Sequence, residues 1–69
     1  MPVISVKMTK EDGGATIEQK EELALGITEL FSKIFQRPSK NAVVLIEELD
    51  MEDYFIGGKS VKKIREEAK

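Results

Sequence analysis

The chain has 69 residues, with 11 basic and 13 acidic side chains and a formal net charge of −2. A domain of this size buries only about 60% of its unfolded surface, and it usually needs disulfides, a metal or association with other chains. Cysteine and histidine are both absent, which excludes disulfides and removes the commonest metal ligand and general base. We therefore expect one domain over residues 1–69, supported by self-association, with no metal and no cofactor.

The charge balance also bears on partners and location. A net negative charge argues against a nucleic-acid surface, which is normally basic. No apolar run approaches the roughly 20 residues of a membrane span, and no signal segment opens the chain. We expect a cytoplasmic protein with no nucleic-acid or membrane partner, although the basic segment at 62–65 leaves nucleic-acid binding as a minor alternative.

Residues 2–8 predict a first β-strand. Apolar and other side chains alternate with period two, so that Ile4, Val6 and Met8 point to one face. Residues 11–14 predict a loop, because the glycine pair that closes this stretch accepts positive φ at little cost.

A long helix is predicted to follow and to end before Pro38. Thr16 can cap its first turn, and Gln19 completes a capping box. Apolar side chains then recur at spacings of three and four, which predicts one broad apolar face made by Leu23, Ala24, Ile27, Leu30, Phe31, Ile34 and Phe35. Gly26 falls off this face and is unfavourable in the middle of a helix. Either another backbone packs closely against it, or the glycine has no particular role.

Residues 42–46 form a continuous apolar run, which predicts a second strand buried on both faces. Strand, helix and strand at this spacing make a β-α-β unit with parallel strands. One helix covers only one face of such a sheet, so another subunit is expected to cover the other face. The fold class is therefore α/β (α+β), with the chain assembling as an oligomer.

The C-terminal part predicts two smaller elements. Residues 51–58 end in a glycine pair after an apolar trio, which is typical of a tight turn or small β-hairpin. Ser60 can cap a short terminal helix, in which Val61, Ile64 and Ala68 recur at helical spacing.

Pro2 is the first candidate for chemistry. Initiator methionine is generally removed before a small residue, and removal of Met1 would leave a secondary amine on the Pro2 ring. The pKa of a terminal amine is about 8, and apolar walls and nearby cations lower it. Pro2 could then act as a base near neutral pH without histidine. The alternative is that proline merely suits the first position of a strand.

The ordered set of features resembles the 4-oxalocrotonate tautomerase family over nearly the whole chain. The matching residues are Pro2, Glu18-Gln19-Lys20, Pro38, Glu47-Glu48 and Ile56-Gly57-Gly58. The loop at 13–16 and Tyr54 are most similar to the DmpI-like bacterial branch of this family.

This resemblance implies a β-α-β subunit in a homo-oligomer, commonly a hexamer built as a trimer of dimers. It implies that the N-terminal proline, here Pro2, moves a proton between oxygen and carbon of a small carboxylic acid. It also implies an aromatic residue beside the proline, and Tyr54 holds that position. The Tyr54 hydroxyl could donate to a developing enolate oxygen, or the ring could be ordinary interface packing.

Two arginines that well-studied members use to hold a dicarboxylate are missing. They belong to the loop after the first strand and to the second strand, where this chain has Val43. Lys10 is a candidate replacement for the first, although a point charge cannot reproduce a bidentate fork. Arg65 falls where some members have a C-terminal arginine. Arg37 and Lys40 are further cations that could reach a neighbour's pocket or could simply be solvated.

The sequence therefore predicts an isomerase for keto-enol tautomerisation of a small 2-hydroxydienoate or enol-pyruvate-type acid. Pro2 is the predicted catalytic base, and Tyr54, Lys10 and Arg65 are the predicted substrate-binding residues. Without the arginine pair we expect poor activity on the dicarboxylate 2-hydroxymuconate and a preference for a smaller or monoanionic acid. The alternative is a non-catalytic oligomeric scaffold or small-ligand binder that kept the fold.

Overall fold

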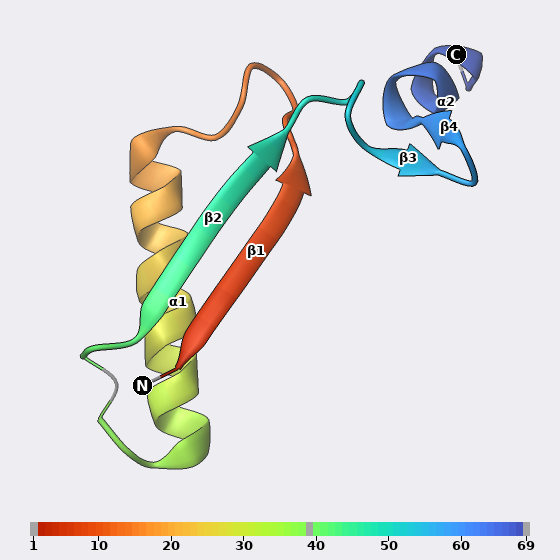
Figure 1. The fold of residues 1–69 in the computed structure, drawn as a ribbon. Helices are drawn as coiled ribbons and strands as arrows, with labels where there is room; N and C mark the ends of the chain where they lie inside the picture. The colour runs from red at the N-terminus through yellow and green to blue at the C-terminus, as the bar shows by residue number, and fades with distance from the viewer. Residues whose placement is uncertain (1, 39, 69) are drawn as a thin grey trace.

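A computed structural model describes residues 2–38 and 40–68 of the chain. A β-α-β unit is followed by a small hairpin and a second helix (Figure 1). The elements are β1 (Val3–Thr9), α1 (Ile17–Phe35), β2 (Val43–Leu49), β3 (Phe55–Ile56), β4 (Lys59–Ser60) and α2 (Val61–Glu67). The hairpin and α2 extend beyond the ends of β1 and β2, so the molecule is elongated, 46 × 25 × 16 Å (Figure 1). The predicted fold class is confirmed.

The strands β1 and β2 are parallel, as predicted, and pair from Val3 with Val43 to Thr9 with Leu49. Just before this ladder, the Pro2 carbonyl accepts the Val43 N–H at 2.9 Å. Parallel strands begin at the same edge of a sheet. The loop that leads from α1 into β2 therefore arrives beside Pro2.

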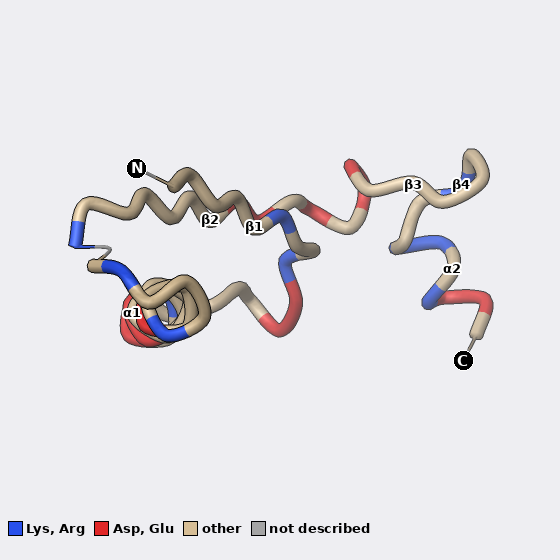
Figure 2. The backbone as a smooth tube through the Cα atoms, turned by 90° about the horizontal axis from the view of Figure 1, so that it is seen from below, with Lys and Arg blue, Asp and Glu red and all other residues tan. Residues whose placement is uncertain are grey.

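The helix α1 covers one face of this two-stranded sheet (Figure 2). The side chains predicted to point together from β1, Ile4, Val6 and Met8, are half-buried, and the residues between them, Val3, Ser5 and Lys7, are exposed. The alternation predicted from the sequence is confirmed.

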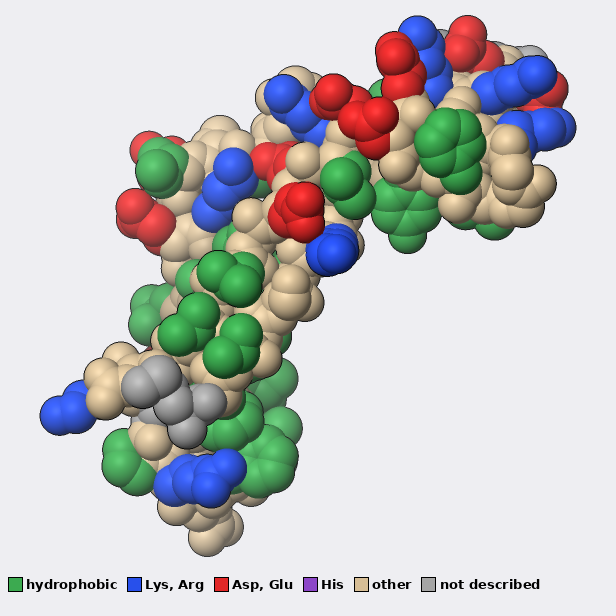
Figure 3. Space-filling model, viewed as in Figure 1, with side chains coloured by type: hydrophobic (Ala, Val, Ile, Leu, Met, Phe, Trp, Pro, Cys, Tyr) green, Lys and Arg blue, Asp and Glu red, His purple; other side chains and the backbone are tan. Residues whose placement is uncertain are grey.

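The opposite sheet face is open in the described part of the chain. Apolar side chains gather on it (Figure 3), and Val3, Val43 and Leu45 are 66%, 37% and 54% exposed. The sequence predicts that another subunit covers this second face of β2, and within one chain the face is open as that prediction requires. One helix follows β1, and it packs on one side only.

Both ends of α1 carry the signals expected from the sequence. The Thr16 side chain accepts the Gln19 N–H at 3.1 Å, and the Gln19 side chain accepts the Thr16 N–H at 2.9 Å. This is the predicted capping box. The helix ends at Gln36, which adopts left-handed backbone angles with φ of 51°, and Pro38 two residues later prevents its continuation.

The sheet covers only part of the apolar face predicted for α1. Ala24, Ile27 and Phe31 are half-buried against the sheet. The others are exposed, from 37% for Leu23 to 62% for Ile34, together with Leu30 and Phe35. A sheet of two strands is too narrow to cover so broad a face. A Cβ added to Gly26 would meet nothing within 4 Å, so no contact among the described residues requires glycine there.

The C-terminal part forms the predicted hairpin and helix. Gly57 and Gly58 have φ of 61° and 84°, which a two-residue hairpin turn of this hand requires. The Ser60 side chain caps α2 by accepting the Lys63 N–H at 3.1 Å. Val61, 8% exposed, is the one buried apolar residue among residues 2–38 and 40–68. Much of the apolar surface of the described residues is thus left exposed.

Replacing the cap of α1 tests its contribution to folding. Thr16→Ala removes the acceptor for the Gln19 N–H, and we expect the free energy of unfolding to fall by about 1 kcal/mol. Urea denaturation followed by circular dichroism measures the change. Thr16→Ser keeps the hydroxyl and should stay close to the parent protein; equal losses in both variants would mean that the cap does not act through this oxygen.

Candidate active site

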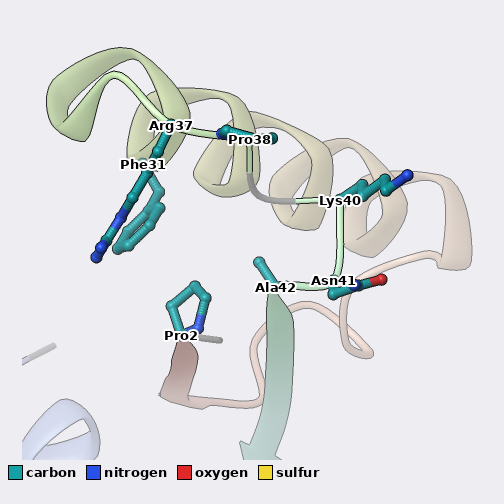
Figure 4. A pocket seen from close by; sticks show the side chains of 7 residues that line it. All are labelled: Pro2, Phe31, Arg37, Pro38, Lys40, Asn41 and Ala42. Carbon is teal, nitrogen blue, oxygen red and sulfur yellow. The ribbon is translucent and has the colours of Figure 1, made fainter.

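A cavity of about 300 Å³ lies where β1 begins, and Pro2 forms part of its wall (Figure 4). The last turns of α1 and the loop into β2 supply the rest. The lining residues are Pro2, Phe31, Arg37, Pro38, Lys40, Asn41 and Ala42. The walls are mainly apolar, and the half-buried Pro2 ring lies against them. Met1, whose removal the sequence predicts, lies outside the described residues.

Arg37 and Lys40 are the cations that line this cavity. The Arg37 side chain runs alongside Phe31 and ends beside that ring, to one side of Pro2, whereas the Lys40 side chain points away (Figure 4). The Arg37 Cζ lies 5.6 Å from the ring centroids of both Phe31 and Phe35, and those two rings are 4.6 Å apart. The guanidinium is therefore held by cation–π contacts at the edge of an apolar cavity.

Tyr54 and Arg65 lie at the other end of β1. They line a second cavity of about 450 Å³ together with Met8 and with residues of β3 and α2. The Tyr54 carbonyl accepts the Val61 N–H at 2.8 Å, which joins the segment before β3 to the start of α2. The structure thus brings together two of the predicted substrate-binding residues, but away from Pro2.

The Arg65 guanidinium is already engaged by Glu11. Nη1 and Nη2 donate to the two Glu11 carboxylate oxygens, the second at 3.0 Å. The Thr9 hydroxyl adds a hydrogen bond of 2.6 Å to the same carboxylate. The Arg65 hydrogen bond, reinforced by that of Thr9, lowers the pKa of Glu11 to about 2, and Glu11 in turn raises the pKa of Arg65. To bind a substrate carboxylate, Arg65 would have to release the Glu11 carboxylate.

Lys10 lies over the loop that follows β1. Its Cε would be 3.2 Å from a Cβ at Gly14, whose φ of 97° also favours glycine. Glu48 lies beside it, accepts the Ala15 N–H at 3.0 Å and pairs with the Lys20 Nζ at 3.2 Å. The Ala15 hydrogen bond is the main cause that lowers the pKa of Glu48, and Lys20 and Lys10 add to it. Lys10 is thus close to a structural carboxylate.

One chain does not assemble the four predicted site residues. Pro2 precedes β1, and Lys10 follows this strand of seven residues, which spans about 23 Å at 3.3 Å per residue. Tyr54 and Arg65 lie at the same far end as Lys10. Sequence reasoning named Arg37 only as one of several other cations and missed Phe31 as a cavity wall. The predicted parallel pairing of the strands could have pointed to the Arg37 loop, because this pairing brings the loop that leads into β2 beside Pro2.

Residues 2–38 and 40–68 lack two further kinds of site. No three acidic side chains gather there as they would around a metal ion. No helix in those ranges has the length and apolar character needed to span a bilayer.

Comparisons with known proteins agree with this architecture. A family model described as "Tautomerase enzyme" matches residues 2–64. A probable tautomerase of Helicobacter pylori is 39% identical over 66 residues, 96% of this chain and 97% of that protein. The crystal structure of DmpI from Helicobacter pylori superposes with a TM-score of 0.85 at 38% identity and covers 94% of this chain and 97% of its own.

A more distant structure has the same fold. A heterohexameric 4-oxalocrotonate tautomerase from Chloroflexus aurantiacus superposes with a TM-score of 0.78 at 26% identity, covering 94% of this chain and all of the other. The β-α-β fold with a hairpin and short helix, together with these matches, defines a tautomerase-type isomerase. The chain belongs to the tautomerase family.

The contact between Arg65 and Glu11 makes a prediction for acid stability. The pKa of Glu11 is lowered from 4.5 to about 2 on folding, so below pH 4.5 the unfolded chain binds the proton first. The stability that this contact supplies is complete above pH 4.5 and is lost as the pH falls toward 2. We expect Glu11→Gln to flatten the dependence of thermal stability on pH in this range. Glu29→Gln, a charge-matched control on α1, should leave it unchanged, and equal flattening in both would contradict the assignment.

Proposed function

We propose that this protein catalyses keto-enol tautomerisation of a small 2-hydroxydienoate or enol-pyruvate-type acid, with Pro2 as the general base after removal of Met1. The observation that carries the proposal is the position of the Pro2 ring in a mainly apolar cavity beside Arg37. Membership of the tautomerase family supports the reaction type.

The proposed reaction is a proton transfer within the substrate. The Pro2 nitrogen accepts the proton of the enol hydroxyl, and a carbonyl forms as the double bonds shift. The protonated nitrogen then gives this proton to a carbon of the conjugated system. The nitrogen returns to its free form, and no co-reactant is consumed.

The surroundings of Pro2 suit a base that works near neutral pH. A terminal amine has a pKa of about 8 before any perturbation. The apolar walls of Phe31 and Pro38 and the cation of Arg37 all disfavour the charged amine and so lower this pKa. The ring restricts the nitrogen to one position, which reduces the cost of orienting it.

The complete site is proposed to form between subunits of a homo-oligomer, with a hexamer as the expected state. Pro2 lies at one end of β1 and Tyr54 at the other, so another chain would supply Tyr54 to the site. Lys10 and Arg65 lie at the same end as Tyr54, beside the carboxylates of Glu48 and Glu11. The open sheet face and the exposed half of the α1 apolar face provide surface for such contacts. Tyr54 would add an apolar wall and a hydrogen bond to the enolate oxygen.

Replacing Pro2 tests the base directly. With Met1 removed and verified by intact mass, Pro2→Ala should lower kcat for phenylenolpyruvate by about 100-fold, because the alanine amine lacks the ring that fixes the position of the nitrogen. The unfolding curve of the variant should match that of the parent, because the backbone carbonyl at position 2 still accepts the Val43 N–H. Equal rates in the two proteins would remove Pro2 from the mechanism and favour a scaffold or ligand-binding role.

Mixing two inactive variants tests whether sites are shared between chains. Pro2→Ala and Tyr54→Ala homo-oligomers should each turn over phenylenolpyruvate poorly. Co-refolded mixtures should recover activity, because some sites then combine an intact Pro2 from one chain with an intact Tyr54 from another. Mixtures of Pro2→Ala with Pro2→Gly are the control and should recover none. Absence of recovery in mass-verified hetero-oligomers would place both residues in one chain or remove Tyr54 from the site.

A further inference from the structure

We infer that Arg37 binds the carboxylate of the substrate in the Pro2 cavity and selects a monocarboxylate with an apolar, conjugated tail. The inference deepens the proposed function, on which it rests for the reaction itself. It assigns to a loop residue the anion-binding role for which the sequence pointed to Lys10 and Arg65.

Two observations together point to Arg37: it lines the Pro2 cavity, and no carboxylate of the described residues takes up its charge. Across residues 2–38 and 40–68, the ion pairs join Lys7 to Glu47, Lys20 to Glu48, Lys59 to Glu67, Lys62 to Glu52 and Arg65 to Glu11. Arg37 pairs with no carboxylate in those ranges, and its partners are two aromatic rings. Lys40 lines the same cavity but points away from it (Figure 4). The guanidinium of Arg37 is thus the cation available to an anion beside Pro2.

Two features restrict the guanidinium of Arg37, whose side chain is exposed. Contact with Phe31 and Phe35, at 5.6 Å from each ring centroid, restricts its rotamers and leaves the hydrogen-bonding edge of the planar group free. On the backbone, Gln36 ends α1 in the left-handed conformation, and Pro38 fixes φ directly after Arg37. A held fork loses less entropy when it binds a carboxylate than a flexible side chain does.

The cavity also defines the rest of the ligand. One guanidinium fork matches one carboxylate with two parallel hydrogen bonds. Phe31, Pro38 and Ala42 supply an apolar wall, which favours a conjugated hydrocarbon tail and disfavours a second charge. A volume of about 300 Å³ is at the lower end for small-molecule sites. A small aryl or alkenyl monocarboxylate fits these requirements.

Binding of a probe that does not turn over tests the inference without relying on catalysis. Cinnamate has one carboxylate and a conjugated tail, and cinnamyl alcohol is its uncharged counterpart. In NMR titrations of the oligomer, we expect Arg37→Gln to raise the Kd for cinnamate by about tenfold or more, because charged hydrogen bonds are lost. The Kd for cinnamyl alcohol should stay nearly unchanged. Lys33→Gln is the matched control, since Lys33 is a cation in the last turn of the same helix; it should bind both probes as the parent does.

Turnover separates this inference from the proposed function. With phenylenolpyruvate, Arg37→Gln should raise KM by about tenfold. The KM of Arg37→Lys should lie between that of Arg37→Gln and that of the parent, since lysine keeps the charge but lacks the fork. Pro2→Ala should lose kcat yet still bind cinnamate. If the parent shows no turnover but cinnamate binding depends on Arg37, the proposed function fails and the inference stands.

Two results would overturn the inference. In the first, Arg37→Gln binds cinnamate as tightly as the parent does. In the second, Arg37→Gln weakens the binding of cinnamate and of cinnamyl alcohol equally. Light scattering then shows that the Arg37→Gln oligomer has dissociated and that the Lys33→Gln oligomer is intact. The second result would show that Arg37 pairs with a carboxylate of a neighbouring subunit, so its role would be assembly and not recognition of the substrate.

Discussion

The parallel pairing of β1 with β2 is the constraint on which the rest of the molecule depends. The hydrogen bond from the Val43 N–H to the Pro2 carbonyl brings the start of both strands to one edge. The residue proposed as base therefore meets the end of α1 and the loop into β2, and a cavity forms between them. The same pairing sends the loop after β1 and the C-terminal hairpin to the opposite edge (Figure 1). The topology alone therefore places Arg37 near Pro2 and places Tyr54 and Arg65 at the far end of β1.

The small size of the chain explains why so much apolar surface is left uncovered. A two-stranded sheet packed by one helix has one protected face, and in the described residues only Val61 is buried. Leu45 on the sheet and Leu30 on α1 are both more than half exposed, although each belongs to a run that reads as core. Domains of this size are marginal alone. Association and assembly of the site would then be one event, with the same contacts stabilising the fold and completing the proposed pocket.

Features set by neighbours in sequence could be predicted, and so could the parallel pairing of β1 with β2. Individual side-chain contacts between distant residues could not. The Thr16–Gln19 capping box and the Gly57-Gly58 turn depend on a few adjacent residues, so the local pattern was sufficient. The covered half of α1 depends on the width of the sheet, which periodicity does not encode. The Arg65–Glu11 contact joins residues 54 positions apart. The direction of the Arg37 side chain depends on two rings from the preceding turns of α1, and only the structure shows it.

The place of the cation in the fold has a consequence for the range of substrates. An arginine at the position of Val43 in β2 would lie on the open face of the sheet, whereas Arg37 lies on the loop before β2 and reaches the cavity from its rim. The apolar wall then extends past the guanidinium without a second cation that points inward. A dicarboxylate in this cavity would have to bury one charge against Phe31 and Ala42 without a partner, at a cost of several kcal/mol. A monocarboxylate would leave only its hydrocarbon part there, so under the proposed function rejection of a dianion would come from the missing second partner and would need no steric block.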